Sequence, residues 1–117
     1  MKKTIVITGG SDGLGKAIAK RLNNDNNVII ISKDEESLTK TAEEINCEYY
    51  VCDVTDYKQV NITINEIVQK NKKIDVLVNN AGIWLAGDLT ETDYERISNC
   101  IDVNTKGPIY MTKAVLP

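Results

Sequence analysis

A run of small residues near the start of the chain decides the fold, and it reads Thr8-Gly9-Gly10-Ser11-Asp12-Gly13-Leu14-Gly15. An apolar, strand-like run precedes it from Thr4 to Thr8, and a segment of helical period follows it from about Gly13 to Asn23. The run is therefore predicted to be a glycine-rich turn that leaves a strand and opens a helix. Glycines at positions 9, 13 and 15 allow a tight turn, close approach of a pyrophosphate and close packing of helix on sheet. The helix N-terminus adds free N–H groups and the positive end of its dipole, which favour an anionic ligand.

Outward from this turn, short β-branched runs alternate with longer amphipathic segments along the whole chain. Further strands are predicted at Val28–Ser32, Glu48–Cys52 and Ile74–Asn79, and further helices at about Asp34–Ile45, at about Asp56–Lys70 and from Thr92 onward. The strands are apolar throughout, which is typical of parallel strands covered on both faces. Residues 1–117 are therefore predicted to form a single α/β domain, a doubly wound parallel sheet of Rossmann type with strand order 3-2-1-4. A ligand is expected at the switch point between the first and fourth strands.

Each predicted helix carries an apolar stripe that should face the sheet. The stripes comprise Leu14, Ala17, Ile18 and Leu22 in the first helix, Leu38, Ala42 and Ile45 in the second, and Val60, Ile64, Ile67 and Val68 in the third. The fourth helix should begin at a capping box formed by Thr92 and Glu95. It should carry Ile97 and Ile101 and continue through much of the remaining chain.

Composition excludes several classes of function. The 117 residues carry a formal net charge of -3 with both signs interspersed, so a nucleic-acid partner is not expected. No apolar run is long enough to span a bilayer and the first residues do not form an export signal, so a cytoplasmic location without a membrane partner is expected. The absence of His excludes Ser-His-Asp and Cys-His catalysis. Cys47, Cys52 and Cys100 are interpreted as buried reduced thiols, with a metal site as the remote alternative.

A second motif, Asn79-Asn80-Ala81-Gly82, follows the fourth predicted strand. Asn side chains can tie adjacent backbone segments together, and the small residues Ala81 and Gly82 let a cofactor ring lie against the chain. The two motifs, T-G-x-x-x-G-x-G and N-N-A-G, resemble those of the short-chain dehydrogenase/reductase family, and the resemblance covers essentially the whole chain. It implies a nicotinamide dinucleotide cofactor and hydride transfer to or from a small-molecule carbonyl or secondary alcohol.

The resemblance also implies roles for residues further along the chain. It implies that Asp53 hydrogen-bonds the adenine amine, that Val54 packs on the adenine ring, and that Asn80 to Gly82 bind the nicotinamide half. It places Asn104 in the family's catalytic set, beside a proton-relay water. From the residues alone, Asp53 can equally be a turn or cap residue and Asn104 an exposed side chain.

Cofactor preference is predicted from Ser32-Lys33, which follows the second strand where family members that prefer NAD usually carry Asp. That acid is absent and Lys33 can pair with a 2′-phosphate, so NADP(H) is favoured over NAD(H). Asp12 argues against this, because some NADP enzymes place a basic residue there. The predicted cofactor-binding residues are Gly9, Ser11, Asp12, Gly13, Leu14, Gly15, Ser32, Lys33, Asp53, Val54, Asn80, Ala81 and Gly82, and the predicted catalytic residue is Asn104.

The family's reaction also needs a Ser and a Tyr-x-x-x-Lys pair, and the pair is missing from this chain. Four residues after its five Tyr come Asp53, Val54, Asn61, Ser98 and Ala114. The chain is therefore expected to be the cofactor-binding N-terminal portion of a dehydrogenase, incomplete at its C-terminus and not catalytically competent by itself. A second copy is expected to cover the open edge of the fourth strand, through edge pairing or packing of the fourth helices.

Other functions stay open from the residues. The chain can be a non-catalytic nucleotide-binding or interaction module, or a flavodoxin-like or response-regulator domain, which fits the alternation of elements but not the two motifs. The substrate is not predicted, because specificity in such folds comes mainly from later loops. Trp84 and Leu85 can form one wall of a substrate site, or Trp84 can pack on the neighbouring helix.

Overall fold

The computed structural model of the chain describes residues 2–83 and 85–117. Within them lie the strands β1 (Thr4–Thr8), β2 (Asn27–Ser32), β3 (Glu48–Val51) and β4 (Val76–Val78) and the helices α1 (Gly13–Leu22), α2 (Glu35–Ile45), α3 (Tyr57–Asn71), α4 (Tyr94–Ile101) and α5 (Gly107–Val115). A 3₁₀ turn (Leu89–Glu91) precedes α4, and a π-helical segment (Asp102–Lys106) joins α4 to α5. The suggestion that Trp84 lines a substrate site falls outside the described residues.

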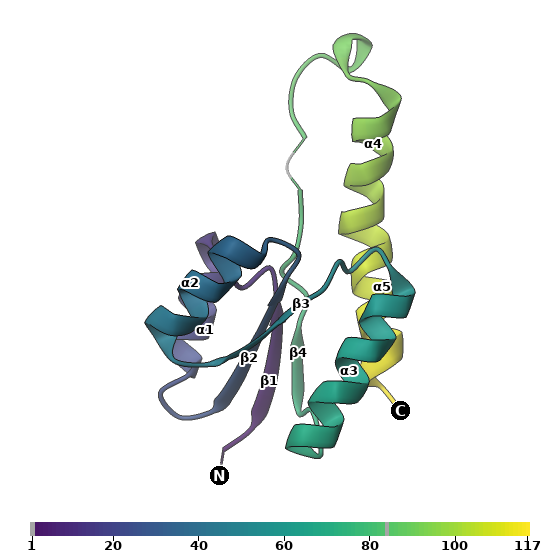
Figure 1. The fold of residues 1–117 in the computed structure, drawn as a ribbon. Helices are drawn as coiled ribbons and strands as arrows, with labels where there is room; N and C mark the ends of the chain where they lie inside the picture. The colour runs from purple at the N-terminus through teal and green to yellow at the C-terminus, as the bar shows by residue number, and fades with distance from the viewer. Residues whose placement is uncertain (1, 84) are drawn as a thin grey trace.

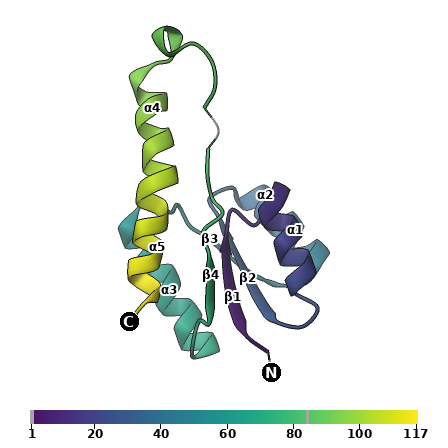
Figure 2. The ribbon, with the colours of Figure 1, turned by 180° about the vertical axis from the view of Figure 1, so that it is seen from behind.

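The strands form one parallel sheet in the order β3-β2-β1-β4, which confirms the predicted doubly wound topology (Figures 1 and 2). β1 lies between β2 and β4, with Val6 opposite Ile29 on one side and Leu77 on the other. Alternate strand residues point to opposite faces. One face packs under α1 and α2 through Ile5, Ile7, Val28 and Ile30, and the other packs under α3 and α5 through Val6, Ile29 and Ile31. Helices therefore cover both faces, as predicted.

The two outer strands differ from the fully buried strands that the sequence predicts. β3 alternates between half-buried and exposed residues, with Tyr49 and Val51 exposed. β4 is shorter than the predicted Ile74–Asn79 and begins at Val76. The reason is that the Asp75 side chain, and not a backbone carbonyl, accepts the hydrogen bond from the N–H of Thr4, over 2.8 Å.

The predicted stripe of α1 is only partly correct. Ile18 and Leu22 are half-buried against the core, but Leu14 is 69% exposed and Ala17 is also exposed, whereas Gly15 and Ala19 are buried. The glycine-rich turn brings α1 so close to the chain beneath it that a Cβ on Gly15 would overlap the carbonyl oxygen of Gly9. Only a small residue fits at this place, and Leu14 is turned outward as a result.

The other helices follow their predicted stripes with local differences. Leu38 and Ala42 of α2 are buried and Ile45 is half-buried; in α3, Val60, Ile64 and Ile67 are buried, but Val68 is 39% exposed. The prediction for Val68 was wrong, because Val60, Ile64 and Ile67, at positions i, i+4 and i+7, already fill the inner face of α3. None of the described helices combines the length and apolar character that crossing a bilayer requires.

The cysteines are free thiols, but only Cys52 is buried as predicted. Cys47 and Cys100 are half-buried. Burial, and after it the charge of Glu48, raises the pKa of the Cys47 thiol to about 11. Because the thiolate is the reactive form, this shift makes Cys47 a poor nucleophile at neutral pH.

α4 begins one residue later than predicted, because Asp93 and not Thr92 is its N-cap. The Asp93 carboxylate accepts from the N–H of Arg96 over 2.8 Å, while the Thr92 hydroxyl donates to the Asp88 carbonyl over 2.9 Å. A carboxylate caps this end well because it also interacts with the positive end of the helix dipole. Helical structure then continues to Val115 through the π segment, as predicted, and α4 itself contributes no buried residue.

Replacing Asp75 with Asn should lower the stability of the fold in a pH-dependent way. The pKa of Asp75 is lowered, first by the hydrogen bond from the N–H of Thr4 and then by Lys73. A carboxyl with a depressed folded-state pKa stabilises the fold above its unfolded pKa of about 3.9, and this contribution disappears as pH falls through the lower folded-state pKa. We expect D75N to lower the urea midpoint at pH 7 and to flatten its decline below about pH 4.

The control is Asp25→Asn, which makes the same charge change at an exposed residue. Urea midpoints measured from pH 7 down to pH 3 by circular dichroism compare the variants. Parallel curves for D75N and the unaltered chain would contradict the assignment of this role to Asp75.

Candidate functional site

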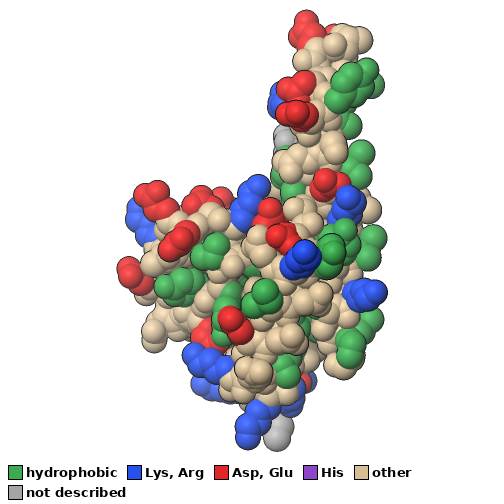
Figure 3. Space-filling view, turned by 45° about the vertical axis from the view of Figure 1, so that its right-hand side comes forward, with side chains coloured by type: hydrophobic (Ala, Val, Ile, Leu, Met, Phe, Trp, Pro, Cys, Tyr) green, Lys and Arg blue, Asp and Glu red, His purple; other side chains and the backbone are tan. Residues whose placement is uncertain are grey.

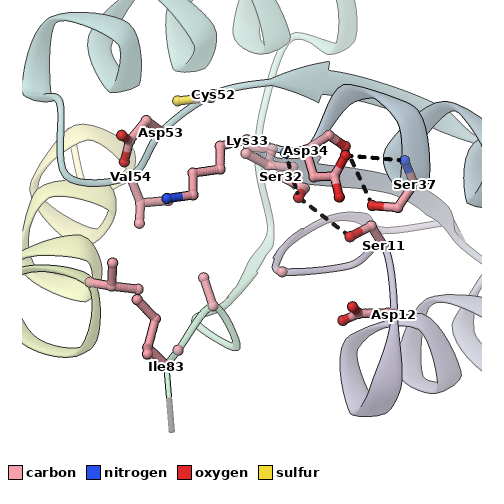
Figure 4. Close-up of a pocket in the computed structure, with 15 residues that line it drawn as sticks. Ser11, Asp12, Ser32, Lys33, Asp34, Ser37, Cys52, Asp53, Val54 and Ile83 are labelled. Atoms are coloured by element: carbon pink, nitrogen blue, oxygen red, sulfur yellow. Dashed lines mark hydrogen bonds between the residues drawn. The ribbon is translucent and has the colours of Figure 1, made fainter. Parts of the chain in front are cut away.

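A cavity of about 230 Å³ opens at the carboxyl ends of all four strands, and its lining includes the segments after β1 and β4, where the sequence predicts a ligand (Figure 4). The predicted residues that line it are Gly9, Ser11, Asp12, Ser32, Lys33, Asp53, Val54, Ala81 and Gly82. The predicted residues that do not line it are Gly13, Leu14, Gly15, Asn80 and Asn104. Segments far apart in the sequence therefore meet at one opening.

The turn after β1 is packed against the turn after β4 at close range. Gly9 has φ +65°, and a Cβ built on it would lie 2.8 Å from the Cα of Ala81. Gly10 is equally constrained, because its Cβ would lie 2.6 Å from the Cγ2 of Ile30. Gly13 has φ +53° but open space around it. A glycine is therefore favoured there by the left-handed backbone conformation and not by lack of room for a side chain.

The buried hydroxyl of Thr8 joins these two turns. Its Oγ1 accepts from the backbone N–H groups of Asn80 and Ala81, each over 3.1 Å, and donates to the carbonyl of Val78 over 3.4 Å. The Asn80 amide donates in turn to the carbonyl of Gly9 over 3.1 Å. The predicted use of Asn side chains to tie backbone segments together is therefore confirmed for Asn80.

Two serine hydroxyls connect the glycine-rich turn to the end of β2. Ser11 Oγ donates to Ser32 Oγ over 3.3 Å, and the Ser32 hydroxyl accepts from the N–H of Asp34 over 3.2 Å. From α2, Thr41 Oγ1 donates to the carbonyl of Ser11 over 2.7 Å in a buried position. The hydroxyl pair forms one polar wall of the cavity (Figure 4).

Charged groups of both signs face the opening. The Lys33 side chain extends across the cavity towards Val54 and away from Ser11 (Figure 4). Asp12 precedes α1 but its side chain caps no backbone N–H, so the first N–H groups of α1 keep no side-chain acceptor. Asp34, in contrast, accepts from the N–H of Ser37 as the N-cap of α2. An anion near the start of α1 would meet backbone N–H groups that the Asp12 side chain does not engage, whereas the Lys33 side chain extends away from this place towards Val54.

Asp53 and Val54 occupy the far wall, beyond β3. Asp53 Oδ1 accepts from both the N–H and the hydroxyl of Thr55, over 2.9 and 2.7 Å. One of the two carboxylate oxygens therefore stabilises the turn that follows β3. Val54 is buried against α5, where a Cβ on Gly107 would lie 2.7 Å from its Cγ2. Gly107 is therefore required by packing, and Val54 presents a fixed apolar surface to the cavity.

Asn104 lies in the π segment, one layer behind the cavity wall. Its Oδ1 accepts from the N–H of Ile83 over 2.7 Å and its Nδ2 donates to the carbonyl of Ile83 over 2.9 Å. Ile83 itself lines the cavity. Asn104 is exposed, which agrees with the alternative that the residues left open, but its amide pairs with both the N–H and the carbonyl of Ile83. π segments inside helices are frequent at functional sites.

A comparison with protein families matches residues 3–117 of the chain to the model for short chain dehydrogenases. The chain belongs to the short chain dehydrogenase family. The match covers both glycine-containing turns and the π segment, and so includes every predicted site residue.

Individual relatives of this short chain dehydrogenase agree with the family assignment. An uncharacterized oxidoreductase of Staphylococcus saprophyticus is 38% identical over 98% of the chain and 52% of its own length. A variant of ElxO with NADPH bound is 42% identical with a TM-score of 0.88, covering 99% of this chain and 50% of its own. A 3-ketoacyl-(acyl-carrier-protein) reductase of Brucella melitensis with NADH is 28% identical with a TM-score of 0.91, covering 98% and 49%. The chain spans about half the length of the curated relatives it matches.

Several residues that line or hold this cavity were missed by sequence reasoning. Thr8 is part of the quoted motif but its hydroxyl was given no role, and Gly10 was not among the candidate glycines. Ile83, Cys52 and Val103 also line the cavity. Thr8 could have been found because it directly precedes the turn, whereas Val103 comes from a helix whose placement no local pattern indicates.

Replacing Thr8 with Val should destabilise this dehydrogenase fold at the junction of the two turns. Val keeps the volume but removes the acceptor for two N–H groups, and leaving partly buried donors unsatisfied costs about 1–3 kcal/mol each. We expect T8V to lower the free energy of unfolding by about 2 kcal/mol, measured by urea denaturation. Thr8→Ser, which keeps the hydroxyl, should lose less. A T8V chain as stable as T8S would show that the hydroxyl does not hold the turns.

Proposed function

We propose that the chain is the cofactor-binding portion of an NAD(P)-dependent oxidoreductase that moves a hydride between nicotinamide and a carbonyl or secondary alcohol. The observation that carries the proposal is the meeting of the glycine-rich turn, the Ser32-Lys33 corner and the Asp53-Val54 wall at one cavity. Residues 1–117 act in it as a single binding domain. Membership of the short chain dehydrogenase family and relatives bound to NADPH or NADH support the proposal.

The cavity offers a matching group for each part of a dinucleotide. The uncapped N-terminus of α1, with Gly9, Gly13 and Gly15 shaping the turn, is suited to the pyrophosphate. The free carboxylate oxygen of Asp53 can accept from the adenine amine while Val54 lies against the ring. Ala81 and Gly82 leave room for the nicotinamide ring. When bound, the cofactor supplies the hydride chemistry, and these residues orient it.

Asn104 contributes through its neighbours in this proposal. Its side chain pairs with Ile83 and with the Cys100 sulfur, so we propose that its backbone, and not its amide, holds the proton-relay water. The chain lacks Tyr followed four residues later by Lys, so we propose that it binds the cofactor without reducing a carbonyl by itself. The same binding would fit the alternative, a non-catalytic nucleotide-binding module.

We propose NADP(H) as the preferred cofactor, because Lys33 is the cation nearest the Ser11–Ser32 pair in sequence and lines the same cavity. Lys33 extends away from Ser11, so pairing with a 2′-phosphate requires rotation of its side chain (Figure 4). Such a rotation is inexpensive for an exposed Lys with a flexible stem. Asp12, which also lines the cavity, weakens the preference by its negative charge.

Replacing Lys33 with Ala should weaken NADPH binding more than NADH binding. An exposed charge pair contributes up to about 1 kcal/mol, so we expect the dissociation constant for NADPH to rise about fivefold and that for NADH to stay within about twofold. Titration by fluorescence or calorimetry measures both. Lys40→Ala, on the exposed side of α2, removes the same charge away from the cavity.

Two results would count against the proposals. If the folded, unaltered chain binds neither NADPH nor NADH, the cofactor site itself is not functional. If K33A and K40A weaken NADPH equally, the preference for the phosphate does not come from Lys33.

We also propose that a second copy of the chain packs against the outer side of α4 and α5. The apolar residues there, which we call the outer stripe, are Tyr94, Ile101, Ile109 and Leu116, exposed by 90%, 56%, 58% and 78%. Figure 3 shows hydrophobic side chains along this side of the molecule from top to bottom. The step from Ile101 to Ile109 is one residue longer than a heptad, and the π segment between them absorbs the extra residue.

The charges beside the outer stripe favour an antiparallel partner of the same kind. Acidic residues outnumber basic ones at its start, where Glu91, Asp93 and Glu95 accompany Arg96, and Lys113 lies near its end, while Lys106 at its middle is paired with Asp102. A two-fold axis across the stripe places the acidic start of one copy against the basic end of the other. Two copies thereby pair unlike charges while covering apolar surface.

Replacing Ile109 with Asp should dissociate this dimer. A charge at the centre of an apolar interface is unpaired and costly to desolvate, so we expect monomers at concentrations where the unaltered chain is dimeric. Sedimentation or light scattering over a concentration series measures the mass. Ile62→Asp is the control, since Ile62 is 61% exposed on α3 and outside the outer stripe. A monomeric unaltered chain, or equal dissociation by I62D, would refute the interface.

A further inference from the structure

The segment after β4 and helix α4 project beyond the sheet, and we call them the arm. The rest of the chain packs little against it. Figure 1 shows the chain rising from the end of β4 and returning as α4. α4 contributes no buried residue to the core. It is continuous with the π segment and α5, which join it to the packed part of the chain. Contacts at the base of the arm contribute to its position relative to the cavity.

Cys100 lies at this base, one helical turn before Asn104. Its thiol donates to the carbonyl of Ile83 over 3.7 Å, and its sulfur accepts from Nδ2 of Asn104 over 3.4 Å. Asn104 holds the N–H and the carbonyl of the same residue. Cys100, Asn104 and Ile83 thus form a closed set of hydrogen bonds, which we call the clamp.

The clamp satisfies the hydrogen-bonding capacity of the Asn104 amide. A primary amide has two N–H donors, and only one of them can point at the Ile83 carbonyl. The Cys100 sulfur provides the acceptor for Nδ2, and the thiol gives the Ile83 carbonyl a second donor. Without the sulfur the amide keeps its pairing with Ile83 but loses the contact that fixes it from the side of α4.

We propose that Cys100 is a positioning residue: through Asn104 and the carbonyl of Ile83, its thiol sets the placement of residues 81–83 at the cavity. Ala81, Gly82 and Ile83 all line that cavity. The inference rests on the proposed function, in which these residues border the nicotinamide half of the cofactor. Cys100 touches no cofactor and acts only through the clamp.

The clamp can be measured without any cofactor, through hydrogen exchange of the Ile83 amide. That N–H is donated to Asn104, so its exchange rate reports how often the clamp opens. We expect Cys100→Ala to raise the exchange rate about threefold to fivefold, while Cys100→Ser stays within about twofold because a hydroxyl can donate and accept in the same way. Ala favours helix, so faster exchange in C100A would not come from a weaker α4.

Ser98→Ala is the matched control, because Ser98 is exposed on the same helix and outside the clamp. It should leave exchange at Ile83 unchanged. Asn104→Ala removes the acceptor itself and should give the largest rise. Unchanged exchange at Ile83 in C100A, or a rise in C100S as large as in C100A, overturns the proposal.

Cofactor binding then tests whether the clamp acts on the nicotinamide half. The probes are NADPH and 2′,5′-ADP, which carries the adenosine half alone. We expect C100A to weaken NADPH about threefold and to leave 2′,5′-ADP within about twofold, with C100S restoring NADPH affinity. Equal weakening of both probes would mean that the substitution loosens the whole fold, and no weakening of either would mean that the clamp does not reach the site.

The two proposals fail in different ways. If the unaltered chain binds neither probe, the cofactor function fails while exchange at Ile83 still reports the clamp. If the unaltered chain binds NADPH but C100A behaves as S98A does in both measurements, the cofactor function stands and the role of Cys100 fails.

Discussion

The contact between the turn after β1 and the turn after β4 is the constraint on which the rest of the structure depends. The Thr8 hydroxyl serves two N–H groups of the second turn, and the glycines allow the two backbones to approach within van der Waals distance. A cavity at a switch point exists only if the chain diverges there, and divergence exposes backbone donors that need acceptors. The buried Thr8 hydroxyl supplies these acceptors. The divergence that opens the cavity and the contact that holds its two turns together therefore both depend on this residue.

Much of the fold could be predicted because it depends on local pattern. The runs of β-branched residues, the helical periods of α2 and α3 and the glycine-rich turn indicate parallel strand order directly, since right-handed crossovers leave few topologies. The errors occurred where distant neighbours decide the outcome. Leu14 has an apolar side chain at a helical position, yet where α1 approaches the chain beneath it most closely only the small Gly15 fits, and Leu14 is exposed. Asp93, and not Thr92, is the N-cap of α4, because its carboxylate is the stronger capping group of these two adjacent residues.

The site was predictable as a set of residues but not as an arrangement. Motifs indicated which segments converge, and the cavity brings Ser11, Ser32 and Asp53 together as expected. The direction of Lys33, the turn that engages one oxygen of Asp53, and the pairing of Asn104 with Ile83 depend on three-dimensional neighbours. The π segment was not predicted, although residues of low helix propensity, Asn104 and Thr105, lie in it and Gly107 and Pro108 follow it directly, because such residues indicate an irregular helix without specifying its hydrogen-bond pattern.

The π segment makes the helical stretch from α4 to α5 more sensitive to the insertion or deletion of a residue than to the replacement of one. A substitution within Asp102–Lys106 alters a side chain but leaves the phase of the helix intact. Deleting one residue there would restore an ordinary α-helix and rotate everything before it by about 100° around the axis. Such a rotation would carry Cys100 away from Ile83 and break the alignment of the apolar residues of α4 with those of α5. In related chains, we therefore expect this stretch to tolerate changes of residue type at positions other than Val103 and Asn104, but not single-residue gaps.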